Sequence, residues 1–376
     1  MLNNNLKNLC LSLAAALLFS TTSHEAYADQ QGYRIHNLVS NMPGAAEQKI
    51  PDPDLVNAWG IAFNPDGFVW VNDNGSGKST LYDGDGNKQR LIVTIPSPTS
   101  GGQSKPTGIV FFGGSKKFLI NNNESRFIFA TEDGTISGWV PPATVSTQIV
   151  NNSSTGAIYK GLALNTDGTR YLLYATDFHN GKVDVFDDAF KPVTLDSTAF
   201  KDPKIKPGFA PFGIQAINGV VFVTYAKQDD PTNAHDDVHG PGLGYVNAYD
   251  ASGHLLQRIA AGGKLNAPWG LAMAPANFGR FSNRLLVGNF GDGSVIAYNL
   301  IHNHHHNGSR LLKSNDTPIQ IDGLWGLSFG NGLRNQPTNA LFFTAGPNDE
   351  ADGLYGKIEA VSMQNPNEDV QGRDGR

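Results

Sequence analysis

The segment from Lys227 to Gly240 gathers several side chains that could hold a metal ion. Carboxylate oxygens suit Ca²⁺ or Mg²⁺, and imidazole nitrogens extend the choice to Mn²⁺, Fe²⁺ or Zn²⁺. His235 and His239 stand four residues apart, so a helical turn would place both on one face. The alternative is a solvated acidic loop, because carboxylates also gather on protein surfaces. The candidate metal ligands are Asp229, Asp230, His235, Asp236, Asp237 and His239.

A second set of candidates stands directly before six glycines that recur along the chain. Its members are Trp59, Thr107, Lys160, Phe212, Trp269 and Trp325. Aromatic rings bordered by a few polar groups form the lining that small ligands prefer. Lys160 is the exception, because an amine facing the same centre needs an acidic partner or an anionic ligand. The alternative is that the rings fill a channel and act only as core.

A third set lies in polar loops further along each repeat. Its members are Asp73, Asn74, Asn122, Asp177, His179, Asn289, Asp292 and Asn348. These side chains would border the aromatic set and supply hydrogen bonds to a ligand. The alternative is that they only shape turns, in which Asp and Asn are favoured regardless of function.

Several other chemistries have no support in the sequence. There is no Gly-x-Ser-x-Gly nucleophile motif, no His-Glu-x-x-His motif and no phosphate-binding glycine loop. The one cysteine, Cys10, lies in the N-terminal leader, so the mature chain has no thiol and no disulfide. The net charge of −6 is spread without long runs of one sign, which argues against nucleic acid or an anionic membrane as partner.

A repeat in the sequence predicts the β-strands that must position these residues. The six glycines are Gly60, Gly108, Gly161, Gly213, Gly270 and Gly326, spaced about 50 residues apart. Each begins an apolar strand, followed by a turn, a second strand, a polar loop, a third strand and a variable fourth strand. This pattern predicts an all-β fold, a six-bladed β-propeller with four antiparallel strands per blade.

Closure of the ring explains why distant residues should meet. The stretch 34–39 precedes the first repeat, and we expect it to supply an N-terminal strand that closes the last blade. In a propeller, the connection into the innermost strand and the loop between the second and third strands share one end. The second and third sets should therefore converge on one mouth of the central channel.

The two ends of the chain lie outside the propeller. Lys7, the apolar run 9–19 and the Ala26-Tyr27-Ala28 pattern predict a signal peptide over residues 1–28. We expect a single propeller domain over 29–363 and a disordered tail over 364–376. The mature protein should be a monomer with no membrane span, exported to the periplasm or secreted.

Some blocks of sequence resemble a known group of proteins. The stretches 267–272, 286–289 and 293–298 resemble repeats of the NHL and gluconolactonase-like (SMP-30-like) six-bladed propellers. Nearly the whole mature chain resembles a family of uncharacterised exported bacterial propellers, most distinctively over 224–229 with 236–238 and 242–246. Gluconolactonase-like enzymes take an acidic metal ligand from just before the first inner strand. Asn57 stands in that stretch here, so their metal site is not carried over.

Three functions follow from these observations. The first is non-catalytic binding of a small molecule, glycan or protein partner at the channel mouth. The predicted ligand-binding residues are Trp59, Asp73, Lys160, Asp177, His179, Phe212, Trp269, Asn289 and Trp325. The second is a divalent-metal-dependent hydrolase or lactonase at the same mouth, which the resemblance to gluconolactonases favours. The third is a structural or cell-surface interaction module, which rests on the fold alone.

Overall fold

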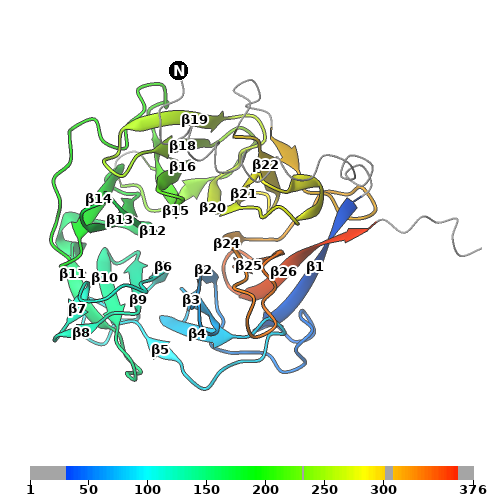
Figure 1. Ribbon diagram of the computed structural model, residues 1–376, viewed down its shortest axis with the longest axis horizontal. Coiled ribbons are helices and arrows are strands. Elements are labelled where there is room, and N and C mark those ends of the chain that lie inside the picture. The colour runs from blue at the N-terminus through cyan, green and yellow to red at the C-terminus, as the bar shows by residue number, and fades with distance from the viewer. Residues whose placement is uncertain (1–30, 231–232, 301–307, 363–376) are drawn as a thin grey trace, which may run out of the picture.

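Six β-sheets are arranged around a central channel, and the innermost strand of each sheet lines that channel (Figure 1). The computed structural model describes residues 31–230, 233–300 and 308–362. The predicted leader 1–28 and tail 364–376 lie outside the described residues. The prediction of an all-β six-bladed propeller is confirmed.

The first three blades occupy the chain from Ala58 to Asp187. Blade 1 contains β2 (Ala58–Phe63), β3 (Val69–Asp73), β4 (Lys78–Tyr82) and β5 (Val93–Thr94). Blade 2 contains β6 (Pro106–Phe111), β9 (Phe127–Thr131), β10 (Thr135–Trp139) and β11 (Thr147–Asn151), with an inserted hairpin of β7 (Leu119–Ile120) and β8 (Asn123–Glu124). Blade 3 contains β12 (Tyr159–Thr166), β13 (Tyr171–Asp177) and β14 (Lys182–Asp187).

The other three blades complete the ring. Blade 4 contains β15 (Phe209–Ile217), β16 (Val220–Gln228), β18 (Tyr245–Tyr249) and β19 (Leu255–Ala261), with β17 (Asp237–Val238) paired to β16. Blade 5 contains β20 (Pro268–Met273), β21 (Leu285–Asn289), β22 (Val295–Tyr298) and β23 (Ser309–Arg310). Blade 6 contains β24 (Leu324–Phe329), β25 (Ala340–Ala345), β26 (Leu354–Ser362) and β1 (Gln31–Ser40).

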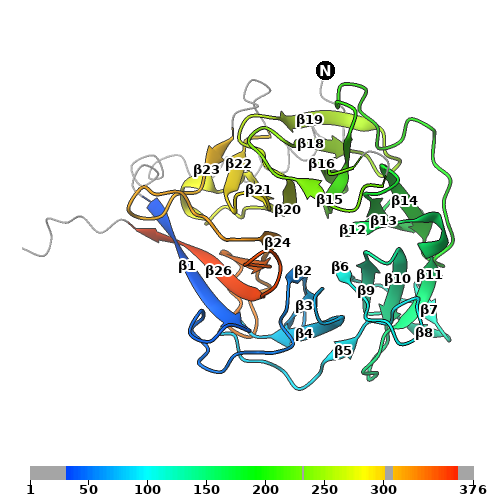
Figure 2. The ribbon, with the colours of Figure 1, turned by 180° about the vertical axis from the view of Figure 1, so that it is seen from behind.

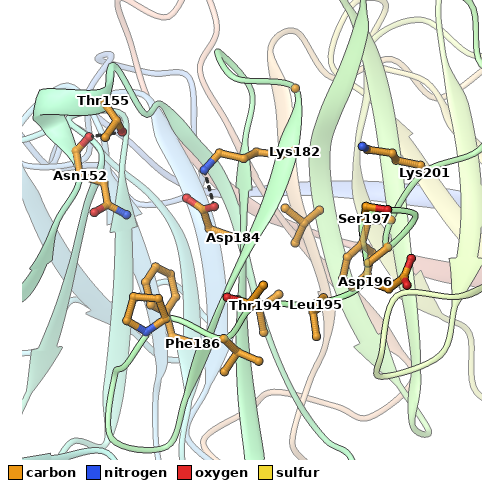
Figure 3. A pocket seen from close by; sticks show the side chains of 17 residues that line it. Asn152, Thr155, Lys182, Asp184, Phe186, Thr194, Leu195, Asp196, Ser197 and Lys201 are labelled. Carbon is orange, nitrogen blue, oxygen red and sulfur yellow. Dashed lines mark hydrogen bonds and ion pairs between the residues drawn. The ribbon is translucent and has the colours of Figure 1, made fainter.

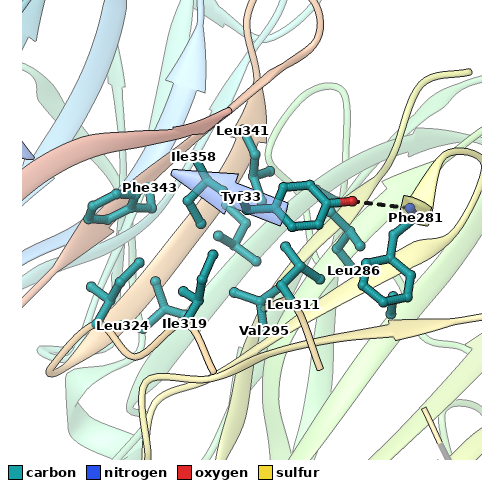
Figure 4. Close-up of a cluster of buried hydrophobic side chains, with 14 of the residues drawn as sticks. Tyr33, Phe281, Leu286, Val295, Leu311, Ile319, Leu324, Leu341, Phe343 and Ile358 are labelled. Atoms are coloured by element: carbon teal, nitrogen blue, oxygen red, sulfur yellow. Dashed lines mark hydrogen bonds between the residues drawn. The ribbon is translucent and has the colours of Figure 1, made fainter. Parts of the chain in front are cut away.

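The N-terminal strand closes the ring as predicted. β1 pairs antiparallel with β26, with Ile35 opposite Ile358 (Figure 2). Tyr33 extends from β1 into the seam between blades 5 and 6, where its hydroxyl donates to Phe278 O at 2.9 Å and accepts from Phe281 N at 3.1 Å. Figure 4 shows this ring within the apolar side chains of the seam. The first strand of the chain therefore fastens the last two blades together.

The recurring glycines mark where neighbouring inner strands approach most closely. A Cβ atom added to Gly60 would lie 2.2 Å from the carbonyl oxygen of Thr107 on the next blade. At Gly213 the same atom would lie 2.1 Å from the carbonyl oxygen of Trp269. No side chain fits there, because real Cβ atoms do not approach backbone so closely. The residue before each glycine is consequently held at the narrow centre of the ring.

Two local features differ from the regular pattern. Blade 3 has three hydrogen-bonded strands, and only an isolated bridge between Phe186 and Pro192 extends it outward. The helical turn considered for His235 and His239 is wrong, because Asp237 and Val238 between them form β17. Where the structure is described, no helix is long and apolar enough to cross a membrane.

Candidate functional site

An aromatic cluster closes the channel at the ends of the inner strands. Trp325 is stacked between Trp59, at a centroid distance of 3.6 Å, and Phe290, at 3.9 Å. Trp269 meets Trp59 and Trp325 edge-on at 6.3 Å and 5.8 Å. Trp59 and Trp325 are each only 1% exposed, whereas Trp269 is partly exposed. These rings form a plug, and Trp269 is the tryptophan whose surface a ligand could reach.

The remaining pre-glycine residues join neighbouring blades. Phe212 is fully buried and contacts Trp325 at 5.8 Å and Phe178 at 5.2 Å. Thr107 is also buried, and its hydroxyl donates to the Tyr159 carbonyl oxygen at 2.6 Å. The six predicted positions therefore do converge on the axis, and most of them do so as core.

Lys160 is the charged member of this set, and its side chain is 1% exposed. Its Nζ lies 2.5 Å from Glu132 Oε1, 2.9 Å from Asp236 Oδ1 and 5.2 Å from the Trp59 ring centroid. Burial acts to lower the pKa of Lys160, but the two carboxylates outweigh burial and hold the pKa above its usual range. The predicted need for an acidic partner is met by loops from two other blades.

A chain of hydrogen bonds extends from this ion pair across the mouth. Asn74 Nδ2 donates to Glu132 Oε2 at 2.9 Å, and Asn57 Nδ2 donates to Asn74 Oδ1 at 3.3 Å. Asn57 Nδ2 also lies 2.5 Å from Glu350 Oε2, and its Oδ1 accepts from Trp325 Nε1 at 3.0 Å. The network thus links the ion pair, the aromatic plug and the loop that carries Glu350.

Glu350 is held over the mouth by an unusual turn. Asn348, Asp349 and Glu350 have consecutive φ angles of 57°, 53° and 65°, in the left-handed region. Non-glycine residues in such conformations cost about 1 kcal/mol or more each and cluster at functional sites. Burial raises the pKa of the Glu350 carboxyl to about 7, against the opposing effect of the Lys160 charge. A carboxyl of this kind can exchange a proton near neutral pH.

The long loop of blade 4 covers another part of the mouth. His239 Nε2 lies 3.1 Å from Asp237 Oδ2, and its ring meets Phe290 edge-on at 5.0 Å. The hydrogen bond to Asp237 raises the pKa of His239, and the charges of Glu350 and Asp349 act in the same direction. His239 therefore shares the mouth with Glu350.

The predicted metal ligands are engaged in different contacts. Asp236 binds Lys160, Asp237 binds His239, and Asp229 Oδ1 accepts from the backbone N–H groups of Asp230 and His235. The His235 ring lies 6.2 Å from that of His179, whose Nδ1 contacts the Ala234 carbonyl oxygen at 2.8 Å. Across residues 31–230, 233–300 and 308–362, no three His, Cys, Asp or Glu side chains come together as a metal site. Metal binding by these six residues stays a prediction.

Three predicted loop residues hold equivalent positions at the ends of second strands. Asp177 Oδ1 accepts from Ile158 N and Asn180 N, each at 3.2 Å. Asn289 Oδ1 accepts from Asn266 N at 3.1 Å. Asp73 is fully buried, its carboxylate oxygens have no hydrogen-bond partner among the described residues, and burial raises its pKa well above the usual range. The Asp177 and Asn289 side chains thus bind loop backbone, and all three side chains are fully buried.

Sequence reasoning missed the two carboxylates that matter most at the mouth. Glu132 escaped notice because the hairpin β7–β8 looked like the second-to-third loop of blade 2, which placed Asn122 at the mouth. Asn122 is exposed in that hairpin, at the opposite end of the blade, so its predicted place is wrong. The true loop is 132–134, between β9 and β10. Glu350 lies only two residues beyond Asn348, so a wider window would have found it.

The chain has recognisable relatives in a giant virus. The uncharacterised protein R648 of Acanthamoeba polyphaga mimivirus is 32% identical over 338 residues, which cover 87% of this chain and 80% of R648. The uncharacterised protein L690 of the same virus is 30% identical over 337 residues, covering 87% and 85%. This chain belongs to the family of these proteins. No family model matches it.

Solved structures of similar shape support the fold alone. Virginiamycin B lyase from Staphylococcus aureus matches with a TM-score of 0.50 and 15% identity, over 88% of this chain and 100% of the lyase. A Bacteroides thetaiotaomicron protein of unknown function matches with a TM-score of 0.56 and 12% identity, over 88% of this chain and 76% of that protein. An α-L-arabinanase from Penicillium chrysogenum, complexed with arabinobiose, matches with a TM-score of 0.53 and 9% identity, over 88% of this chain and 98% of the arabinanase. The resemblance to NHL and gluconolactonase-like propellers stays a prediction.

Proposed function

We propose that this protein is exported and binds a small polar molecule at the channel mouth formed around Lys160, Glu132, Glu350 and Trp269. The observation that carries the proposal is a fully buried lysine paired with Glu132 and Asp236. A purely structural pair at this place would be replaced by apolar packing at little cost. Buried charges, a strained turn and a raised carboxyl pKa at one mouth are typical of a binding site.

The charges around the mouth favour a neutral, hydroxylated or cationic ligand. The acidic groups are Glu132, Asp236, Asp237, Asp349 and Glu350. They outnumber the basic groups Lys105, Lys160, His235 and His239. The partly exposed Trp269 offers an aromatic face for an apolar sugar face or an organic cation. We therefore place glycans and organic amines ahead of anionic ligands.

The test is a ligand screen read by tryptophan fluorescence and by melting temperature. The panel contains neutral oligosaccharides, amino sugars, organic amines and, as a contrast, sugar acids. Trp269→Ala should weaken binding of any hit at least tenfold. Trp139→Ala is the matched control, because Trp139 lies at the far end of blade 2, and it should leave binding unchanged. Equal binding by both variants would contradict the proposed site.

Hydrolysis of an ester or lactone at the same mouth is the second candidate. Glu350, with a pKa of about 7, has the proton affinity expected of a general base at neutral pH. A panel of esters and lactones, assayed with and without chelator and with Glu350→Gln, distinguishes the two functions. Turnover lost in Glu350→Gln would favour the enzyme, and an inert protein would favour binding.

A further inference from the structure

The outer edge of blade 3 is open over half its length. β14 pairs with β13 on its inner side, and every other blade carries a fourth strand outside the third. Among the described residues, two backbone hydrogen bonds join β14 to the segment outside it: Val193 N donates to Val185 O at 2.8 Å, and Asp187 N donates to Lys191 O at 2.9 Å. The segment that follows β14 therefore begins to pair with it as a fourth strand near Phe186 and then turns away from β14.

An aromatic anchor explains this departure. Phe200 is 4% exposed and packs against Tyr174, at 5.6 Å, and Tyr249, at 5.2 Å. Its backbone N–H donates to the Gly253 carbonyl oxygen at 2.8 Å, on blade 4. Because Phe200 is fixed in the seam between blades 3 and 4, the segment that follows Val193 cannot continue along β14.

A cavity of about 450 Å³ lies in the space left beside β14. The strand itself, residues 182–186, and the connecting segment 192–201 form two of its walls, and Asn152 and Thr155, which follow β11, also line it (Figure 3). Val185, Leu195 and Phe200 contribute apolar side chains to its lining. Lys182 and Lys201 are both exposed at its rim.

The backbone of β14 offers unused hydrogen-bonding groups to this cavity. The bonds made by Val185 O and Asp187 N show that these two residues face outward. Since outward-facing residues alternate along a strand, Val183 faces outward as well. Among the described residues, the N–H and C=O groups of Val183 and the N–H group of Val185 have no backbone hydrogen-bond partner. An unpaired row of this kind is a template for another strand.

We propose that this edge binds an extended peptide of a partner protein, which completes blade 3 as its fourth strand. Main-chain hydrogen bonds to Val183 and Val185 would supply affinity, and an apolar side chain would enter the cavity. The lining also carries Asp184, which pairs with Lys182, and Asp196, whose Oδ1 accepts from the backbone N–H and the hydroxyl of Thr198. Lys201 has no ion-pair partner among the described residues, so charge complementarity favours an acidic side chain beside it. The occupant is therefore a peptide in which apolar and acidic residues alternate. This proposal does not depend on the ligand at the channel mouth.

Val183→Pro is the decisive variant. Proline removes the outward N–H and is tolerated on edge strands, so the β13–β14 ladder should remain intact. A display library of random decapeptides is selected on the wild-type protein and, in parallel, on Val183→Pro. We expect enrichment of alternating acidic and apolar sequences on the wild type alone. A melting temperature of Val183→Pro close to that of the wild type confirms that the fold is retained.

A second arm measures the selected peptides directly. Hydrogen exchange at the Val183 and Val185 amides should slow at least tenfold at saturating peptide. Lys201→Glu should weaken binding at least tenfold, whereas Lys116→Glu, at an exposed lysine on blade 2, should not. Failure to enrich any peptide, equal enrichment on Val183→Pro, or a dimer that already covers this edge would each overturn the proposal. If Val183→Pro is unfolded, the Lys201→Glu and exchange results decide alone.

Discussion

Replacing Lys160 with methionine removes the charge on which the mouth network is built. Lys160 is 1% exposed and Glu132 is 16% exposed, so the change leaves a largely buried carboxylate without its cation. Breaking a buried ion pair in this way costs about 3–5 kcal/mol. Glu132 keeps its hydrogen bond from Asn74 and some contact with water, so we expect a loss of about 2–3 kcal/mol in the free energy of unfolding.

The partners of Lys160 should not matter equally. Asp236 is 69% exposed, and an ion pair with such a group contributes about 0–1 kcal/mol. Asp236→Asn should therefore change stability far less than Lys160→Met does. The double variant Lys160→Met/Glu132→Gln should recover part of the loss, because neither side chain then leaves an unpaired charge.

Urea denaturation at pH 7, followed by circular dichroism, measures these free energies. Lys182→Met is the matched control, since this lysine also belongs to blade 3 but is 48% exposed. We expect it to cost less than about 1 kcal/mol. An Asp236→Asn variant as destabilised as Lys160→Met, or a double variant less stable than Lys160→Met, would contradict the role given to the buried Lys160–Glu132 pair.

The remaining predictions concern the plug and two buried carboxyls. Trp325→Ala should lower the free energy of unfolding by about 3–5 kcal/mol in denaturation experiments, because Trp325 is stacked on both faces. Trp269→Ala should cost clearly less, because Trp269 is partly exposed. Equal costs would contradict the packing described. Burial raises the pKa of Asp73 in the folded protein, so the free energy of unfolding should fall as pH rises above about 3.9, the pKa of an Asp in the unfolded chain. Asp73→Asn introduces the residue type that Asn289 supplies in blade 5, and it should remove this fall and raise the free energy of unfolding at pH 7. The pKa of Glu350 is raised from 4.5 to about 7 in the folded protein, so the protonated carboxyl stabilises the fold fully below pH 4.5, and this stabilisation is lost as pH rises through 7. Glu350→Gln should flatten that part of the profile of stability against pH. An unchanged profile would show that Glu350 does not titrate there.

Much of the architecture could be predicted because it depends on local chemistry. A glycine at the closest approach of two inner strands has no substitute, so it recurs in every blade and reveals the repeat. The closing strand was predictable because an open ring leaves unpaired edges. The acidic partner of Lys160 was predictable for a similar reason, since a buried amine cannot remain alone.

The details of the mouth could not be predicted from the pattern. Whether Trp59 and Trp325 form a plug or an open ring depends on how far the inner strands converge, which spacing along the chain does not report. Glu132 was hidden by an inserted hairpin that imitates a strand and loop. Glu350 owes its place to a left-handed turn of non-glycine residues, which local preference disfavours and the surrounding contacts impose.

The most direct test of ligand binding at the mouth is a crystal structure with the tightest ligand from the fluorescence screen. We expect ligand density above the aromatic plug, in contact with Trp269 and within hydrogen-bonding distance of Glu132 or Glu350. Density only elsewhere, for example in the cavity beside β14 or at the opposite end of the channel, would contradict it.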